Sequence, residues 1–518
     1  MSWRDAAVGA VLAAPLAALC LTHGHAVDYY AALNDFWGNA FAADTWAPSA
    51  RALWNGFYPP GYPTLLAWLP GSRLVVSAYV ANVAAGWALL AALFAGVAGL
   101  GGRWAAAGAL GLVALHPDVA TQVLTTGADA PFVAVAVTGA LLLHVAATSG
   151  RGRDGDDRIT PRSTISAVGA GLCLAAAAWL RYHGFVFALG ALAAGVVVGG
   201  RRAVRPLAIA ASIVAVAGVS LLLLGVAAGD VGRLQRAQAF NVFKGHVGAV
   251  NWYHLDPGTL PASVGEAIAR DPAAFRKSYL AYVAPHLWLA VVPLVAALAA
   301  RTTEVRRFAV FAGVTSAVFV PLVDLGASPR GVVAAVPLVL AAVVLVIADL
   351  VRRAPEARRT AAAGLAAAGV AAAVAWAWVP ATRGFLADVR QQASTSRALE
   401  ARLKADRVRI GVQVFTDFDF YFLDAPGWQV TSYHPRAIGG WPSLDLTGYA
   451  NAFPTPSTAS LDRFLDDCQA MGVTHLVLTP NAAAIQPDLG RLATGERTSP
   501  RVLEVEGIPG VRIFRLVG

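Results

Sequence analysis

The chain has 518 residues, of which 57% are hydrophobic and only 14% are charged, and its formal net charge is +9. Soluble globular proteins carry about 25% charged residues, so this composition excludes a soluble fold. The positive charge does not indicate nucleic-acid binding, because most arginines lie in short loops between apolar runs, as expected for a membrane protein. The three cysteines show no metal-binding or disulfide spacing.

Eleven apolar runs, each close to the length that crosses a bilayer, predict a polytopic α-helical membrane protein. Their approximate ranges are 6–22, 74–99, 104–124, 130–148, 165–180, 184–200, 206–226, 283–300, 308–326, 329–350 and 360–379. Arginines cluster after every second run. The positive-inside rule therefore predicts a cytoplasmic N-terminus in the plasma membrane, with the alternate loops on the extracytoplasmic side.

Two extracytoplasmic loops are unusually long for connections between helices. Residues 23–71 join the first two runs, and residues 229–282 join the seventh and eighth. The second loop is aromatic and amphipathic in places, which favours one or two helices lying on the membrane surface. Ser263, followed three residues later by Glu266, is a capping-box pattern and predicts a helix start there. Together these segments make up a transmembrane domain of residues 1–380.

Residues 381–518 are more polar and predict a small extracytoplasmic α/β domain. The expected elements are an exposed helix, a strand, an amphipathic helix, a buried strand and a hairpin: 398–406, 408–415, 460–471, 474–478, and 501–506 with 511–516. The domain therefore lies on the same side of the membrane as the two long loops.

The first long loop carries three acids, Asp28, Asp35 and Asp44. Asp28 lies just beyond the first helix, where partial desolvation raises a carboxylate pKa towards general-base use. An ordinary solvated acid at a helix end explains the same residue. Asp35 and Asp44 compete with it, although Asp44 also suits a helix N-cap. Tyr58 begins the Pro/Gly-rich end of this loop. This segment either sets the path of the chain into the second span or contacts substrate.

Two further extracytoplasmic sites carry charge close to the membrane. Asp129 lies at the start of the fourth span, where an acid next to Pro131 is already explained by its favourable interaction with the helix dipole. It also lies on the same side of the membrane as Asp28, which favours a role in a shared site. Arg181 and His183 lie in a turn too short to be a solvated loop. An arginine there either extends to the headgroups or binds an anion such as a lipid phosphate.

Three more external residues, Lys244, His246 and Arg330, are either interfacial anchors or substrate contacts. The sequence contains no P-loop, dinucleotide fingerprint, zinc-protease motif or nucleophile elbow. Chemistry driven by a soluble nucleotide is therefore not supported.

This arrangement resembles the GT-C superfamily of integral-membrane glycosyltransferases, in particular the branch with the protein O-mannosyltransferases and the aminoarabinose transferases of lipid A. The resemblance covers the pattern of residues 5–200. It rests on four features of the sequence. An acid, Asp28, follows the first helix, and an aromatic, Pro/Gly-rich segment, 55–63, leads into the second span. An acidic segment, 127–132, begins the fourth span, and Arg181 follows the fifth. The family often has an acidic pair in the first loop, whereas Tyr29 follows Asp28 here.

The resemblance implies transfer of a sugar from a polyprenyl-phosphate donor to a lipid, polysaccharide or protein acceptor of the cell envelope, on the extracytoplasmic face. It implies Asp28 as the general base of an inverting reaction, Asp129 as a second acid of the site, and Arg181 as a contact to the donor phosphate. No cofactor is required, and a divalent metal is compatible with the residues but not demanded by their spacing.

Two other functions are weighed against this one. A transporter or lipid-carrier flippase needs ionisable residues deep in the spans and two related halves. The clearest acid within a span is Asp324, near one end of the ninth, and no halves are evident. An assembly factor without chemistry would not need the aromatic first loop or the short turn at Arg181.

Overall fold

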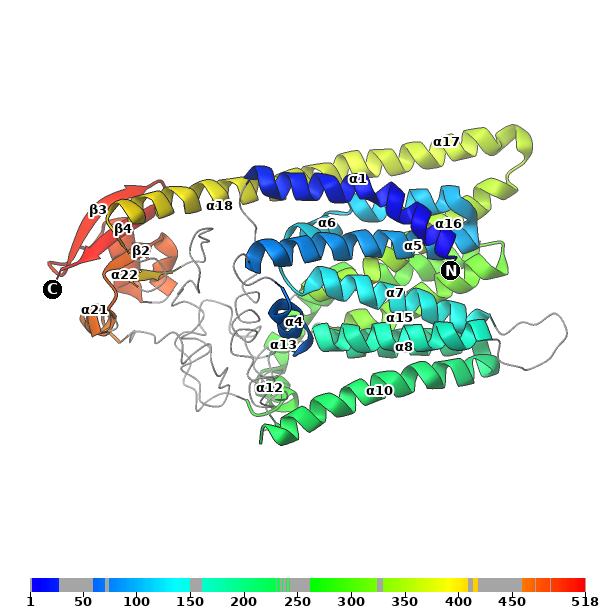
Figure 1. Ribbon diagram of the computed structural model, residues 1–518, viewed down its shortest axis with the longest axis horizontal. Helices are drawn as coiled ribbons and strands as arrows, with labels where there is room; N and C mark the ends of the chain where they lie inside the picture. The colour runs from blue at the N-terminus through cyan, green and yellow to red at the C-terminus, as the bar shows by residue number, and fades with distance from the viewer. Residues whose placement is uncertain are drawn as a thin grey trace.

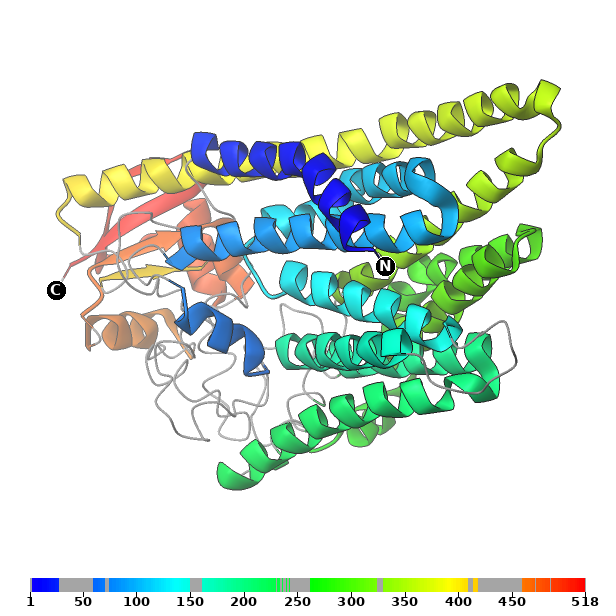
Figure 2. The same cartoon turned by 45° about the vertical axis from the view of Figure 1, so that its right-hand side comes forward.

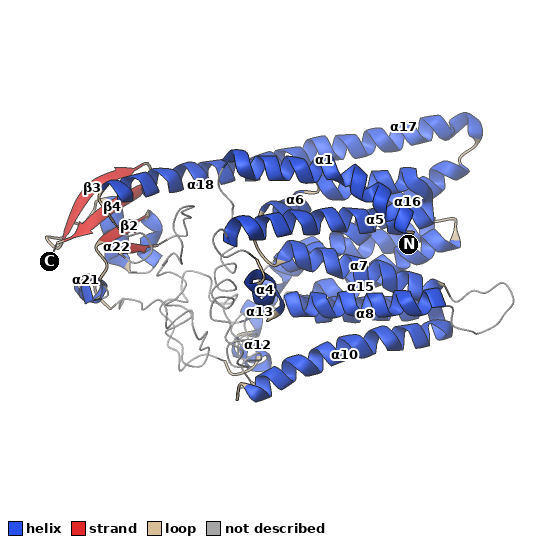
Figure 3. Cartoon of the chain, viewed as in Figure 1, coloured by secondary structure: helices blue, strands red, loops and turns tan. Residues whose placement is uncertain are grey.

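The computed structural model describes residues 2–27, 59–69, 74–149, 161–229, 231–232, 235, 239, 242, 261–323, 329–408, 413–417, 459–470, 472–484 and 486–517. Several residues named from the sequence lie outside the described residues: Asp28, Asp35, Asp44, Tyr58, Lys244, His246 and Asp324. Long helices lie side by side in a bundle, and the strands are confined to one end of the molecule (Figures 1 and 3).

The helices of the bundle follow the apolar runs, because a helix satisfies its backbone polar groups internally. In chain order they are α1 Trp3–Val27, α4 Gly61–Ala67, α5 Leu74–Leu115, α6 Pro117–Leu124, α7 Asp129–Thr148, α8 Pro161–Leu180, α9 His183–Gly199, η2 Gly200–Ala203, α10 Val204–Ala227, α12 Val264–Arg270, α13 Pro272–Val283, η5 Ala284–His286, α14 Trp288–Ala299, α15 Thr303–Val323, η6 Pro329–Ala335, α16 Val336–Arg353 and α17 Glu356–Ala373.

Within the described residues, nine helical stretches are long and apolar enough to cross a membrane. One of them, Val75–Leu115, reverses at Gly102, whose φ of 82° lies in the left-handed region that glycine tolerates. The reversal brings Asn82 against Thr125, to whose carbonyl its Nδ2 donates a hydrogen bond of 2.6 Å. This stretch is a hairpin of two crossings, and its turn is visible in Figure 2.

A second stretch, His183–Ala227, reverses through η2. A Cβ on Gly195 would lie 2.6 Å from the Leu207 side chain, so α9 and α10 pack closely after the turn. With each hairpin counted as two crossings, the nine stretches match the eleven predicted spans. The prediction of a polytopic helical membrane protein is confirmed.

The two ends of the bundle differ in what lies there. At one end the N-terminal helix is tied to the α5 hairpin by an ion pair between Arg103 Nε and Asp5 Oδ1, 3.1 Å apart. At this end Asp349 also accepts backbone hydrogen bonds from Arg301 and Thr302, at 2.7 and 2.9 Å. The C-terminal sheet lies beyond the other end (Figure 1). The N-terminus and the C-terminal domain therefore occupy opposite ends, as the loop charges predict.

The second long loop contains the expected helix start at Ser263. The Glu266 backbone N–H donates to Ser263 Oγ at 3.1 Å, and the Glu266 carboxylate accepts from the Ala262 N–H at 2.8 Å. The eighth apolar run, predicted at 283–300, is occupied by η5 and α14, and α13 ends at its first residue, Val283. The Tyr279 hydroxyl donates to the Pro321 carbonyl at 2.9 Å and attaches α13 to α15.

A long helical stem joins the bundle to the C-terminal domain. It consists of α17, a π-helical turn Val374–Trp378, and α18 Val379–Ala405. The exposed helix expected at 398–406 is therefore wrong in extent and in burial. The helix starts earlier, and Leu399 and Leu403, one turn apart, are fully buried against the sheet.

The C-terminal domain is a four-stranded sheet of order β1-β2-β4-β3. Its strands are β1 Val414–Thr416, β2 His475–Leu478, β3 Val502–Ile508 and β4 Val511–Leu516, with helices α21 Leu461–Ala470, η8 Pro480–Ala484 and α22 Pro487–Thr494. Strands β1 and β2 are parallel, and the remaining pairs are antiparallel. The predicted amphipathic helix, buried strand and hairpin are confirmed.

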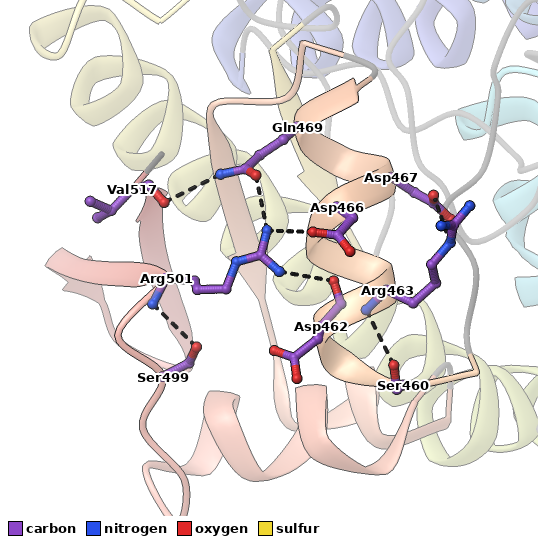
Figure 4. Close-up of polar contacts among 9 residues, drawn as sticks. All are labelled: Ser460, Asp462, Arg463, Asp466, Asp467, Gln469, Ser499, Arg501 and Val517. Atoms are coloured by element: carbon purple, nitrogen blue, oxygen red, sulfur yellow. Dashed lines mark hydrogen bonds and ion pairs between the residues drawn. The ribbon is translucent and has the colours of Figure 1, made fainter.

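One arginine links α21 to the sheet (Figure 4). Arg501 Nη2 lies 2.8 Å from Asp466 Oδ1 and 2.9 Å from Gln469 Oε1, and its Nη1 donates to the Asp462 carbonyl at 3.1 Å. Gln469 in turn donates to the Val517 carbonyl at 3.2 Å. These contacts hold the segment before β3 and the residue after β4 against α21.

Candidate functional site

Asp129, the first residue of α7, lies at the centre of a charged cluster at the end of the bundle that faces the C-terminal domain. Its side chain is only 2% exposed. Asp129 Oδ1 lies 2.5 Å from Arg181 Nε, and Oδ2 lies 4.0 Å from Arg330 Nη1. Three residues that the sequence places on separate segments therefore meet at one point.

The turn that presents Asp129 is held from the neighbouring helix. Asn82 of α5 is fully buried and donates to the carbonyl of Thr125, at the end of α6. Pro131 then occupies the first turn of α7, where its missing N–H costs nothing. The α7 N-terminus and the Asp129 carboxylate are thereby fixed relative to α5.

The turn that presents Arg181 is closed tightly between α8 and α9. The Arg181 N–H donates to the Ala177 carbonyl at 2.9 Å, and the Gly184 N–H donates to the Arg181 carbonyl at 2.8 Å. A Cβ on Gly184 would lie 2.3 Å from the backbone of Ala177 and Ala178, so only glycine fits. The guanidinium therefore projects from a rigid turn.

A second glycine brings α4 against this turn. A Cβ on Gly61 would lie 2.5 Å from the carbonyl oxygen of Trp179, near the end of α8. Tyr62, the next residue, is 1% exposed. The described part of the aromatic exit, from residue 59 onwards, thus packs against the end of α8, the helix that directly precedes Arg181.

His183 and Arg330 come together through Gly331. A Cβ on Gly331 would lie 2.8 Å from Val323 Cγ2 and 3.1 Å from His183 Nδ1, so the ring lies directly against the backbone that follows Arg330. Asp129, Arg181, His183 and Arg330 are the four sequence-named site residues that the structure describes, and it gathers all four.

Among the described residues, the cluster brings two guanidinium groups to one carboxylate. Buried charges persist only when they are paired and hydrogen-bonded, and Asp129 supplies that pairing. Guanidinium groups, with their positive charge and planar N–H donors, suit a phosphate group. Among the described residues, no group of three or more His, Cys, Asp or Glu has the arrangement of a metal site.

Asn82 and the polar residues buried near it were not among the site residues predicted from the sequence. Asn82, Gln122, Thr125 and Thr126 are all buried at this end of the bundle. The available signal was an asparagine inside an apolar run, because an amide buried in a membrane helix needs a hydrogen-bond partner. Its partner, the Thr125 carbonyl at the end of α6, cannot be predicted from sequence spacing.

Comparison with known proteins gives a match only at the level of structure. No family model matches the chain, and no curated protein matches it by sequence. The crystal structure of ArnT from Cupriavidus metallidurans bound to undecaprenyl phosphate superposes with a TM-score of 0.51, over 98% of each chain, at 16% identity. The chain has the ArnT fold.

The same ArnT in the apo state gives a TM-score of 0.50 at 15% identity, over 96% of this chain and 97% of that one. The ArnT fold therefore extends over both the helical bundle and the C-terminal domain. The resemblance to the GT-C glycosyltransferases, and to their aminoarabinose transferase branch, is confirmed as a resemblance of fold.

Proposed function

We propose that this protein is a plasma-membrane glycosyltransferase that moves a sugar from a polyprenyl-phosphate donor to an acceptor on the extracytoplasmic face. The observation that carries the proposal is the cluster of Asp129, Arg181 and Arg330 at one end of an ArnT fold. An ArnT of that fold was solved with undecaprenyl phosphate bound. The cluster has the charge and the donors that such a phosphate needs.

The chemistry fits a bundle of this kind. The donor's lipid tail partitions into the bilayer, so the phosphate and sugar reach the protein at the membrane boundary. As the bond to the sugar breaks, negative charge develops on the phosphate. Guanidinium groups fixed beforehand in a poorly solvated site stabilise that charge without reorganising, and they replace a strong general acid.

Asp28 is the proposed general base of an inverting displacement, and takes the proton from the acceptor hydroxyl as the oxygen attacks the anomeric carbon. It directly follows Val27, the last residue of α1. The end of α1 is held against α5 by the Tyr79 hydroxyl, which donates to the Cys20 carbonyl at 2.7 Å. This hydrogen bond places the last two turns of α1 alongside the start of α5.

Asp129 suits a different role from Asp28. One of its oxygens faces Arg181 and the other faces Arg330, so both oxygens are directed at cations and not at an acceptor hydroxyl. We assign it to the site as the counter-ion that holds the two guanidinium groups. This assignment favours Asp28 over Asp129 as the base.

The remaining assignments complete the proposal. Asp44, Tyr58, Lys244 and His246 are candidate contacts to donor or acceptor, and the extracytoplasmic C-terminal domain helps to select a lipid, polysaccharide or protein acceptor. The N-terminus is cytoplasmic. The reaction needs no cofactor, because phosphate departure relies on the guanidinium groups.

The test is a transfer assay with the full chain in nanodiscs. Purified protein is mixed with radiolabelled undecaprenyl-phosphate sugars and envelope acceptors, and release of undecaprenyl phosphate is followed. We expect turnover by the wild type and its loss in Asp28→Asn, with Asp118→Asn, a half-exposed acid next to α6's start, as the matched control. Full activity of Asp28→Asn would reassign the base, and absence of both donor binding and turnover in the wild type would refute the proposal.

A further inference from the structure

We propose that the helical stem positions the donor end of the bundle through the contact between Trp378 and His116. Trp378 is the last residue of the π-helical turn in the stem. His116 directly precedes α6, and the chain that leaves the far end of α6 forms the turn that presents Asp129. Both are therefore positioning residues. Their link to the donor rests on the proposed function, whereas their link to α6 does not.

A proline explains why the stem leaves regular α-helical geometry where it passes the bundle. Pro380 lies in the first turn of α18, four residues after Trp376, and it has no N–H to donate to the Trp376 carbonyl. Its ring also crowds that carbonyl. The chain forms a π-helical turn there, Val374–Trp378. Such turns are rare, occur mostly as single turns within α-helices, and are frequent at functional sites.

The π-helical turn carries two tryptophans with different surroundings. Residues two positions apart in a helix point to nearly opposite faces. Trp376 is 87% exposed, whereas Trp378 is partly buried. The centroid of the Trp378 ring lies 4.9 Å from that of the His116 ring, with the two planes at 61°. Aromatic rings attract one another in this edge-on geometry, so Trp378 attaches the stem to the bundle.

The His116 ring is oriented by this contact and not by a hydrogen bond from Nδ1. The residue is 6% exposed, and its Nδ1 has no hydrogen-bond partner among the described residues. The nearest acid oxygen, Asp118 Oδ2, is 3.8 Å from Nδ1, beyond hydrogen-bond distance. The His116 backbone joins α5 to α6, because its N–H donates to the Val113 carbonyl at 3.3 Å and its carbonyl accepts from the Ala120 N–H at 2.9 Å. A displaced ring would therefore displace the start of α6.

The short helix α6 carries the position of His116 to the donor end. It has only 8 residues, Pro117–Leu124, so its two ends move together. At its far end the Thr125 carbonyl accepts the hydrogen bond from Asn82, and α7 begins at Asp129, four residues later. A shift of α6 would therefore strain this hydrogen bond and move the turn that presents Asp129.

The long helix α18 carries the position of the C-terminal domain to the same contact. It runs for 27 residues from the π-helical turn to the sheet, where Leu399 and Leu403 are fully buried (Figure 1). Beyond its first turn it contains no proline or π-helical turn, and such a helix bends only gently. It also packs against α6. The C-terminal domain and the donor end are thus connected by two helices that meet at Trp378 and His116.

Hydrogen exchange of residues 117–128 in the full chain, in nanodiscs, measures this positioning without a donor or an acceptor. Trp378→Ala removes the ring, and Trp376→Ala is the matched control, because it removes the same side chain from an exposed position of the same turn. We expect Trp378→Ala to raise exchange in α6 at least about 10-fold while exchange in α7 and α8 stays unchanged. Trp378→Phe, which keeps an aromatic ring, should restore most of the protection, and Trp376→Ala should match the wild type.

A second variant covers a folding defect. If Trp378→Ala does not fold, Trp378→Leu takes its place, since it keeps apolar volume but lacks the ring. The same rise in α6 exchange is expected for it. Equal exchange of α6 in the Trp378 and Trp376 variants would overturn the inference.

Binding of undecaprenyl phosphate to the same proteins tests the link to the donor. Trp378→Ala should raise the Kd at least about 5-fold, and Trp376→Ala should leave it unchanged. Faster exchange of α6 with an unchanged Kd would overturn the link to the donor end. If the wild type does not bind undecaprenyl phosphate, the proposed function fails, and the exchange comparison still decides whether Trp378 positions α6.

Discussion

The guanidinium of Arg181 and the carboxylate of Asp129 form a buried ion pair, with Nε and Oδ1 2.5 Å apart. The pair joins the α8–α9 turn to the start of α7, and both side chains are almost completely removed from solvent. A lone charge at this position would be strongly destabilising, so each residue is required by the other. The pair also fixes a carboxylate next to the proposed phosphate site.

The first prediction concerns the energy of this pair. Asp129→Asn leaves the Arg181 charge buried without its partner and should cost about 3–5 kcal/mol of stability. The double variant Asp129→Asn/Arg181→Gln removes both charges and should recover part of that loss. A double-mutant cycle on thermal unfolding in detergent measures the coupling. Additive single effects would show that the two side chains do not interact in the folded protein.

The second prediction concerns the α8–α9 turn. Gly184→Ala introduces a Cβ 2.3 Å from the Ala177 backbone, so the turn must open and Arg181 must move. We expect a loss of donor binding together with a lower Tm. The matched control is Gly364→Ala in α17, where a Cβ meets nothing within 4 Å and a helical alanine is favourable. Equal behaviour of the two variants would contradict the tight turn.

The third prediction concerns the support of the Asp129 turn. Asn82→Ala leaves the buried Thr125 carbonyl without its 2.6 Å hydrogen bond, at a cost of about 1–3 kcal/mol. Because Asp129 follows shortly after Thr125, donor affinity should fall as well. Trp87→Phe removes a similar bond, from Nε1 to the Ala10 carbonyl at 2.7 Å, away from the site. That control should leave donor affinity unchanged, and a loss of affinity in both variants would argue for a general packing effect.

The fourth prediction concerns the pH dependence of the C-terminal domain. Burial raises the pKa of Asp417 to about 6, although hydrogen bonds from the Thr479 N–H and hydroxyl oppose the shift. A raised carboxyl pKa means that the folded state holds the proton more tightly than the unfolded state. This contribution to stability is present below the unfolded pKa of about 4 and is lost as the pH rises through about 6.

Hydrogen exchange of residues 472–484 in the full chain measures this effect between pH 4 and 7, after correction for the intrinsic rates. The free energy of opening obtained from the exchange rates should fall by up to about 3 kcal/mol as the pH rises across this window in the wild type. Asp417→Asn, which stays neutral, should show a flatter profile, while the control Asp488→Asn should keep the wild-type slope. An unchanged slope in Asp417→Asn would assign the pH dependence to other groups.

Much of the fold was predictable because bilayer length and apolar runs determine each helix separately. The eleven crossings, the helix start at Ser263 and the 501–516 hairpin all depend on local pattern. The burial of Leu399 and Leu403 was missed, since it depends on which distant strand α18 meets. Asp129 and Arg181 were named singly, but their contact depends on helix neighbours that spacing does not specify. Asp28, Asp44, Tyr58, Lys244 and His246 lie outside the described residues, so their roles stay predictions.

The most direct measurement of the central claim is an experimental structure of the full chain with undecaprenyl phosphate in nanodiscs. We predict phosphate density at the end of the bundle facing the C-terminal domain, within hydrogen-bond distance of the Arg181 or Arg330 guanidinium. Phosphate density away from both arginines, or a phosphate held by residues at the Asp5–Arg103 end of the bundle, would contradict the account.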